Sequence, residues 1–300
     1  RVQFTKEIQR TTVQGSLLTL KVEGLLGGHS GQDIDKERQN ADLLMARMIQ
    51  RLLKETKGQL VSFNGGTKDN AIPRECEASL IYESDEEAAK AEELACELAE
   101  TYAEELTPAE PDFSCEISCE TNRTAEAIPQ DAAKEFICAM RLAPNGIQKR
   151  NIKMDGFVVV SLNLGVVRTE EDRIVMIFSP RSSVASLQED TKERLNTLAE
   201  TFGFTVSHSS EYPGWSFKED SPVREICKES YKELFGEDLK IEAIHAGLEC
   251  GLFSDAIKGL DAIAIGPTIA NCHTPDEYLT LDSFERFYEF LKDILSRLAK

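Results

Sequence analysis

The chain has 300 residues, and 41% of them are hydrophobic, which is enough to bury a core in one or two domains. Its 53 acidic and 34 basic residues give a net charge of -19, so the chain repels nucleic-acid phosphates and lacks the basic face that anionic membranes attract. We therefore expect neither nucleic acid nor a membrane among its partners.

Cysteine usage indicates a reducing compartment. The eight cysteines are scattered through long periodic segments of a chain too large to depend on disulfides. We therefore expect reduced thiols and a cytoplasmic protein. No apolar run is long enough to span a bilayer, and no signal peptide is recognisable. The chain begins at Arg1 rather than Met, which indicates processing or a missing upstream segment.

The first half of the chain predicts a sheet covered by helices. Apolar residues that alternate toward the end of the segment 17–23 predict the first strand, and the glycine-rich turn 27–31 follows it. Apolar residues spaced by three and four then predict a one-sided helix. The predicted elements are strands at 17–23, 60–63, 75–82 and 113–120, and helices at 40–53 and 85–106.

The second part partly repeats this order. It predicts helices at 132–142 and 187–202, a hairpin of strands 157–167 and 173–179, and a strand at 204–207. Both parts place a pair of strands before a helix and a strand, which indicates a weak internal repeat. The fold class is therefore α/β, with a duplicated sheet-and-helix unit of α+β type.

Composition changes near Ser210, so we expect two domains, 1–210 and 211–300. In the second, Ser221 followed by Pro222 predicts a helix start, and Gly236 predicts its end. Short strands are expected at 239–244 and 262–265, and a last helix at 282–298.

Histidines are few, and two of the four, His245 and His273, occur in loops typical of a site. His273 follows an apolar strand and precedes a helix, where open α/β sheets place ligands. His245 and Glu249 share a glycine-rich segment that predicts a tight strand-to-helix turn, and we assign Glu249 no definite role. Because an imidazole can activate a thiol, a nucleophilic pair of Cys250 and His245 is an alternative. A surface or turn role remains open for each histidine.

Three further polar residues stand near predicted strand ends. His29 lies in the turn 27–31, where an exposed imidazole can donate a hydrogen bond to an oxyanion. Arg181 can bind a carboxylate through two parallel hydrogen bonds. Asn70 and Arg181 could equally be structural, and His208 is predicted to be structural.

Seven short motifs together resemble aminoacyl-histidine dipeptidases, also called Xaa-His dipeptidases or peptidase D. The resemblance runs from about Thr19 to the C-terminus. Any one motif is weak, but the whole set in this order is highly specific. The motifs are GGHSG at 27–31, FNGGT at 63–67, NAIPRE at 70–75, SLNLGVV at 161–167, YPGW at 212–215, IHAGLECGLF at 244–253, and GP followed by HTPDE within 266–277.

The resemblance implies a two-zinc metallopeptidase of dipeptides whose catalytic domain carries an inserted lid. Residues 1–210 would be the lid, a candidate homodimerisation surface, and 211–300 would be the C-terminal part of the catalytic zinc-peptidase domain. By position, His273 matches a zinc ligand and His29 a catalytic lid histidine that reaches the substrate. Asn70, Arg181 and Gly247 match substrate-binding positions.

The family's other zinc ligands and its general base precede the lid, as a His-x-Asp pair, a bridging Asp, a Glu-Glu pair and a further Asp. The chain has no His-x-Asp, and its Glu-Glu pairs, such as Glu86-Glu87, fall in a predicted lid helix. Most of the metal site is therefore expected outside these 300 residues. The alternative is a lid and assembly module that has no activity by itself.

Overall fold

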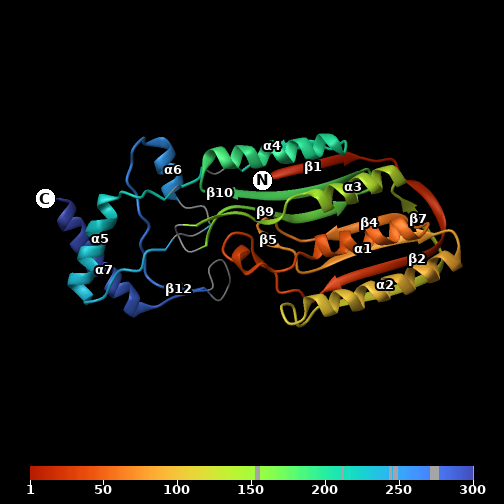
Figure 1. Cartoon of the computed structure of the whole chain (residues 1–300), viewed down its shortest axis with the longest axis horizontal. Coiled ribbons are helices and arrows are strands. Elements are labelled where there is room, and N and C mark those ends of the chain that lie inside the picture. Colours follow the sequence, from red (N-terminus) through yellow and green to blue (C-terminus); the bar gives the residue numbers. More distant parts are fainter. Residues whose placement is uncertain are drawn as a thin grey trace. The chain divides into compact units, whose positions relative to one another are not determined.

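The computed structural model describes residues 1–152, 156–210, 213–215, 217–242, 245, 249–270 and 277–299 (Figure 1). The chain divides into two compact units. One comprises Arg1–Glu211 with Ile244–Ala246, and the other Tyr212–Ala243 with Gly247–Lys300. Among the described residues, no helix has both the length and the apolar character needed to cross a membrane.

The first unit is built on one antiparallel sheet. Its strand order is β11-β1-β10-β9-β4-β6-β2-β7, and β8 pairs with β9 beside this path. The strands are β1 Val2–Glu7, β2 Thr11–Glu23, β4 Gln59–Gly65, β6 Cys76–Tyr82, β7 Ser114–Ala127, β8 Gly146–Asn151, β9 Phe157–Thr169, β10 Arg173–Ser182 and β11 Thr205–His208.

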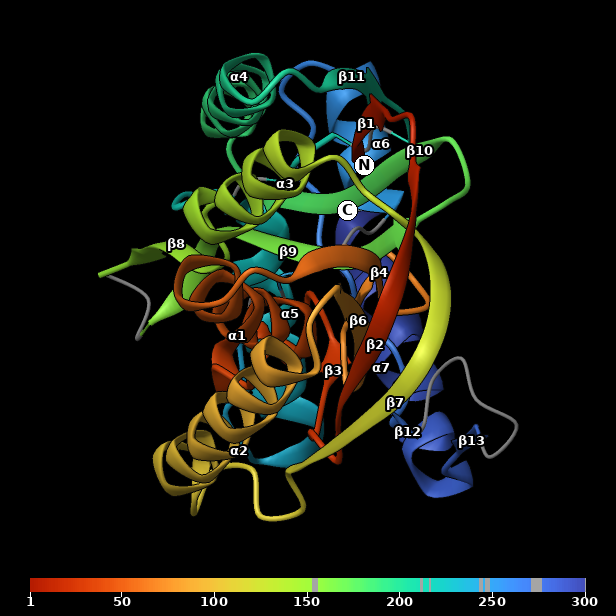
Figure 2. The same cartoon turned by 90° about the vertical axis from the view of Figure 1, so that its right-hand side faces the viewer.

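Four helices cover one face of this sheet, as Figure 2 shows. They are α1 Ala41–Glu55, α2 Asp85–Leu106, α3 Gln130–Leu142 and α4 Ala185–Thr201. Two of them begin at side-chain caps, which satisfy amides that the first turn leaves unpaired. Asn40 accepts from the amides of Asp42 and Leu43, and Ser84 accepts from that of Glu87. The predicted apolar stripe of α1 is buried against the sheet: Leu44, Met45, Met48, Ile49 and Leu52.

Strand order confirms the predicted duplication. In the first repeat the order β4-β6-β2-β7 is covered by α1 and α2, and in the second the order β9-β10-β1-β11 is covered by α3 and α4. The second repeat takes its strand β1 from the start of the chain, before the first repeat begins. The sequence analysis missed β1 for this reason, because its place in the sheet depends on partners far along the chain.

The two repeats join between β4 and β9. Gly65 pairs with Val167 across this junction. The Phe63 amide donates to the Thr169 hydroxyl at 2.9 Å, and the Arg168 guanidinium donates to the Gly65 carbonyl at 2.7 Å. These bonds close the edge of β4 that the first repeat alone would expose to solvent.

The second unit has a small core of its own. It contains the helices α5 Pro222–Phe235, α6 Glu249–Ala256 and α7 Leu281–Leu298, and a pair of short strands, β12 Ile269–Ala270 and β13 Tyr278–Leu279. Cys227 of α5 packs with Phe290 and Ile294 of α7. As predicted, α5 begins after the Ser221 cap and ends at Gly236.

Two predicted strands of this unit are wrong. Residues 239–242 and 262–265 lie outside any strand, and residues 243 and 244 lie outside the described residues. An apolar run becomes a strand only when a neighbouring strand accepts and donates its backbone hydrogen bonds. Within the described part of this unit, β12 and β13 pair only with each other.

Candidate functional site

Two loops of the first repeat lie side by side through a short strand pair. The strands β3 (Gly28–His29) and β5 (Ala71–Ile72) pair antiparallel, with His29 opposite Ala71. The Ser30 amide donates to the Asn70 carbonyl at 2.9 Å. His29 and Asn70, two candidate site residues far apart in the sequence, are therefore neighbours.

The tautomer of His29 is set by its own turn. The amides of Gly31 and Gln32 donate to its Nδ1 at 3.2 and 3.1 Å. Because Nδ1 acts as an acceptor, the proton of the neutral ring is on Nε2. The Asp33 carboxylate accepts from the His29 amide at 2.8 Å and fixes the turn. His29 is thus in the form that donates a hydrogen bond from Nε2.

Asp33 is held in its charged form. Burial acts to raise its pKa, but hydrogen bonds from the Lys36 side chain and the His29 backbone, with the nearby positive charges of Lys36 and Arg38, bring the pKa below its usual value. The Lys36 Nζ lies 2.6 Å from the Asp33 carboxylate. The carboxylate therefore keeps its bond to the turn over the neutral pH range.

Strand β9 anchors the loop that carries Asn70. The Asn163 side chain, which is 1% exposed, donates to the Ala71 carbonyl at 2.8 Å. A Cβ at Gly165 would lie 2.5 Å from the Asp69 carbonyl oxygen, so only glycine permits this approach. The SLNLGVV motif thus holds a loop of the first repeat against a strand of the second.

Arg181 and His245 meet beside Ser161. Arg181 on β10 is paired in register with Ser161 on β9. The Nε2 of His245 lies 2.7 Å from the Ser161 hydroxyl oxygen, and the ring also bonds to the Val158 backbone. Burial and the positive charge of Arg181 lower the pKa of His245 to about 4. The imidazole is therefore neutral at neutral pH.

The Arg181 guanidinium is suited to bind an anion. It is half-buried, and within the described part of the chain its Nε has no hydrogen-bond partner. Burial lowers its pKa, and the charge of Asp69 opposes this. A half-buried guanidinium without a hydrogen-bonded acid gains stability from an incoming carboxylate.

The loops of His29 and His245 touch through a glycine. A Cβ placed on Gly31 would lie 2.5 Å from the His245 carbonyl oxygen and 3.1 Å from Cε1 of His29. The absent side chain of Gly31 is what allows this approach. The first unit therefore brings His29, Asn70, Arg181 and His245 to one region.

The remaining candidate residues do not join this group in the described structure. Gly247 and His273 lie outside the described residues. Glu249 stands in the first turn of α6. His208 is exposed and bonds to Asn196 at 3.1 Å, which agrees with a structural role.

The structure does not support the alternative of a Cys250–His245 pair. The Cys250 thiol donates to the Ile263 carbonyl at 3.7 Å, while the imidazole is engaged by Ser161 and the Val158 backbone.

Metal ligands do not cluster in the described part of the chain. Among those residues, no three His, Cys, Asp or Glu side chains are placed to hold a metal ion. The described residues therefore do not form a metal centre by themselves. The sequence analysis also missed Ser161 and Asn163, although polar residues inside an apolar strand were a usable signal.

The first unit thus brings Arg181 of strand β10 and the two histidines His29 and His245 together beside one repeated antiparallel sheet. The chain belongs to peptidase family M20/M25/M40, whose profile matches residues 66–297, and the profile of the peptidase dimerisation domain matches residues 20–111.

Two relatives match nearly the whole chain. The cytosol non-specific dipeptidase of Escherichia coli (strain K12) is 32% identical over 99% of this chain and 62% of its own length. The structure of aminoacylhistidine dipeptidase from Vibrio alginolyticus is also 32% identical, with a TM-score of 0.90, over 99% of this chain and 60% of its own. The chain therefore spans about three fifths of each relative, and its resemblance to aminoacyl-histidine dipeptidases is confirmed.

Proposed function

We propose that the protein containing this chain hydrolyses dipeptides of the Xaa-His type in a metal-dependent reaction. The observation that carries the proposal is the half-buried Arg181 guanidinium beside the neutral imidazole of His245; its Nε has no hydrogen-bond partner among the residues that the structure describes. The match to two dipeptidases over 99% of the chain favours this function over an inactive lid and assembly module. A cytoplasmic location agrees with the name of the Escherichia coli relative.

In this proposal Arg181 binds the free carboxylate of the substrate. Its side chain can give two parallel N–H bonds to the two carboxylate oxygens, and the low exposure of the site strengthens them. The neutral His245 leaves the positive charge of Arg181 available to the substrate. A fixed carboxylate position close to the reacting bond admits only very short peptides.

His29 and Asn70 are proposed to act on the other side of the bound dipeptide. With Nδ1 occupied as an acceptor, His29 is arranged to donate from Nε2 to the oxyanion that forms when the peptide carbonyl is attacked. Asn70 and Gly247 are proposed substrate-binding positions. The pairing of β3 with β5 keeps His29 and Asn70 at a fixed separation while the lid closes.

The metal is proposed to be zinc, as two ions in the full-length enzyme, with His273 as one ligand. When bound, such ions polarise a peptide carbonyl and lower the pKa of a water molecule. The contribution proposed for the described residues is to bind and orient the dipeptide. We propose residues 1–210 as the lid and 211–300 as part of the catalytic domain. The match to the dimerisation profile supports a homodimer.

The test compares substrates with and without a carboxylate. The full-length enzyme is assayed with Gly-His and with Gly-His-amide, as wild type and as Arg181→Met. We expect wild type to prefer the free acid. In the variant, the ratio of activity on the free acid to activity on the amide should fall by about 30-fold or more, because removing one partner of a buried charged pair costs about 2–5 kcal/mol.

A second arginine on the same strand provides the matched control. Arg173 is exposed and pairs with Glu170, so Arg173→Met should leave the preference unchanged. An unchanged preference in Arg181→Met would refute the carboxylate assignment. Absence of dipeptide hydrolysis by the metal-loaded wild type would refute the function itself.

A further inference from the structure

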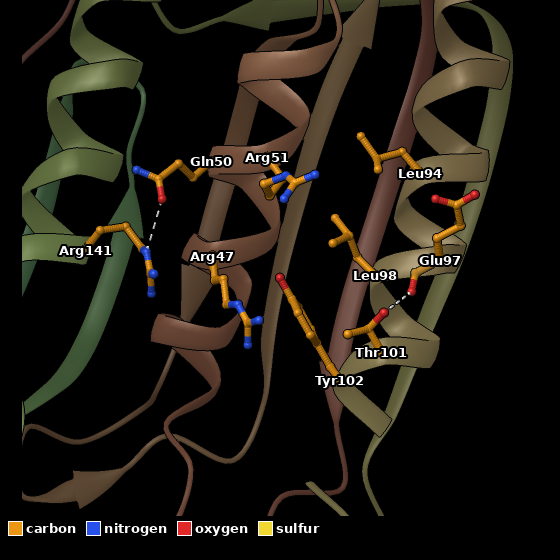
Figure 3. Close-up of a pocket in the computed structure, with 9 residues that line it drawn as sticks. All are labelled: Arg47, Gln50, Arg51, Leu94, Glu97, Leu98, Thr101, Tyr102 and Arg141. Carbon is orange, nitrogen blue, oxygen red and sulfur yellow. Dashed lines mark hydrogen bonds between the residues drawn. The ribbon is translucent and has the colours of Figure 1, made fainter. Parts of the chain in front are cut away.

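A cavity lies among the helices of the first unit. It has a volume of about 410 Å³ and is lined from α1, α2 and the end of α3 (Figure 3). That volume is within the range of small-molecule sites. None of the residues discussed above as substrate-binding lines it.

Three arginines make this cavity basic in a chain whose net charge is -19. Arg47 pairs with Glu105 through two bonds of 2.5 and 2.9 Å, and Arg51 pairs with Glu55 at 2.6 Å. Arg141 donates to the Gln50 side chain at 3.3 Å and has no acidic partner within the described residues. One positive charge therefore remains uncompensated.

An acidic residue at the same cavity does not cancel that charge. Glu97 also contributes to the lining. Figure 3 shows its carboxylate apart from the three guanidinium groups, and no ion pair joins it to them in the described structure. The basic side of the cavity is therefore open to an external anion.

The Tyr102 hydroxyl is a second, independent observation that points to a ligand. Tyr102 is 0% exposed, and its hydroxyl has no hydrogen-bond partner among the described residues. Figure 3 shows the hydroxyl directed toward the space beside Arg47 and Arg51. The Arg47 guanidinium lies over the Tyr102 ring, 4.4 Å from its centroid. A buried unpaired hydroxyl is costly, and an acceptor entering the cavity would relieve that cost.

We propose that this cavity binds a small phosphate monoester, with Arg141 and the Tyr102 hydroxyl contacting the phosphate. Two of the three arginines already pair with a glutamate carboxylate. To compete with these carboxylates for the arginines, an incoming group needs a larger negative charge than a carboxylate carries. A phosphate monoester carries about -1.5 to -2 at neutral pH and offers three acceptor oxygens. Leu94 and Leu98 form an apolar wall on α2 that suits the organic part.

The test is a titration of the 300-residue chain with phenyl phosphate, with inorganic phosphate and benzoate as comparison ligands. Binding is followed by calorimetry and by amide shifts of α1 and α2. We expect phenyl phosphate to bind at least about fivefold more tightly than either comparison ligand, because only it has both the charge and the apolar group.

Variants distinguish binding in this cavity from non-specific attraction of the phosphate to positively charged side chains. We expect Arg141→Gln to weaken binding at least about tenfold, and Tyr102→Phe to weaken it about threefold without lowering the melting temperature. Arg123→Gln removes an arginine that pairs with Glu120 on β7, outside the cavity, and should have no effect. Equal weakening by Arg123→Gln and Arg141→Gln would overturn the proposal. So would equally tight binding of benzoate, or no saturable binding of phenyl phosphate at millimolar concentration.

Discussion

The buried carboxyl group of Asp42 makes the stability of the first unit depend on pH. Asp42 lies in the first turn of α1 and is 0% exposed, and among the described residues the weak thiol donor of Cys76 is the group that bonds to its carboxyl group. Burial raises its pKa from 3.8 to about 8, and the Cys76 thiol and the Arg168 charge offset only part of this rise. The group is therefore protonated in the folded chain at neutral pH.

The raised pKa fixes the direction of the effect. Below the unfolded pKa both states hold the proton, and the unit has its full stability. As pH rises toward the folded pKa, the unfolded chain releases the proton while the folded chain keeps it, so unfolding becomes easier. One pKa unit corresponds to about 1.4 kcal/mol, so this group lowers the free energy of unfolding by up to about 4 kcal/mol between pH 5 and pH 8.

The substitution Asp42→Asn should abolish this dependence. Urea unfolding is followed by far-ultraviolet circular dichroism from pH 5 to pH 8, and the free energy of unfolding is compared with wild type at each pH. The amide adds a constant cost, because its donors are unpaired in the same site. The difference between variant and wild type should therefore change by about 4 kcal/mol in favour of the variant as pH rises.

The duplication supplies a matched control. Asp131 is the second residue of α3, as Asp42 is of α1, but it is exposed. Asp131→Asn should shift stability by a similar small amount at every pH. A difference between Asp42→Asn and wild type that stays constant within about 0.5 kcal/mol across this range would refute the assignment of a buried, protonated carboxyl group.

Two further substitutions test how the loops and repeats are joined. Gly31→Ala places a Cβ 2.5 Å from the His245 carbonyl oxygen, so we expect a loss of about 1–3 kcal/mol in thermal unfolding and a raised KM for dipeptides in the full-length enzyme. Arg10 donates to the backbone carbonyls of Val61, Glu126 and Glu170 at 2.6–2.8 Å. We therefore expect Arg10→Met to lower the free energy of unfolding in urea by about 2–3 kcal/mol. The side chain of Arg123 is exposed, so Arg123→Met should lower it by less than about 0.5 kcal/mol.

Elements that depend on local sequence pattern were predictable. The helix expected at 85–106 is α2, with the same bounds, because its Ser84 cap and its spacing of buried alanines are local signals. By contrast, β1 and the short strands β3 and β5 depend on partners distant in the sequence. The pairing of β3 with β5 is two residues long, which is too short for a periodic pattern.

The candidate site was predictable only in part, and mostly through the family motifs. His29, Asn70 and Arg181 are individually ordinary loop and strand residues, and pattern alone gave none of them a partner. The contacts that assemble them depend on the close approach of the His245 backbone to Gly31 and on the Asn163 side chain within β9. Such tertiary contacts have no periodic signature, so sequence reasoning could name the residues without placing them.

The junction between the repeats also bears on how the proposed homodimer can form. The dimerisation profile matches residues 20–111, which contain β4, β6 and the last four residues of β2 from the first repeat. In this chain the free edge of β4 is already covered by β9 of the second repeat, through the Gly65–Val167 pair and the Thr169 hydroxyl. A second copy cannot add its own strand at that edge without displacing β9.

In the described sheet, the path of paired strands ends at β7 and β11, and β8, which pairs only with β9, also has a free edge. Strand β7 is the longest of the three, with 14 residues against 6 in β8 and 4 in β11, and so offers the most unpaired backbone groups for pairing between two copies. A homodimer joined by strand pairing should therefore use β7. Replacing Thr124 with proline in this strand would remove a backbone donor and should convert such a dimer to a monomer in sedimentation experiments. A dimer that persists in Thr124→Pro would place the interface on another surface.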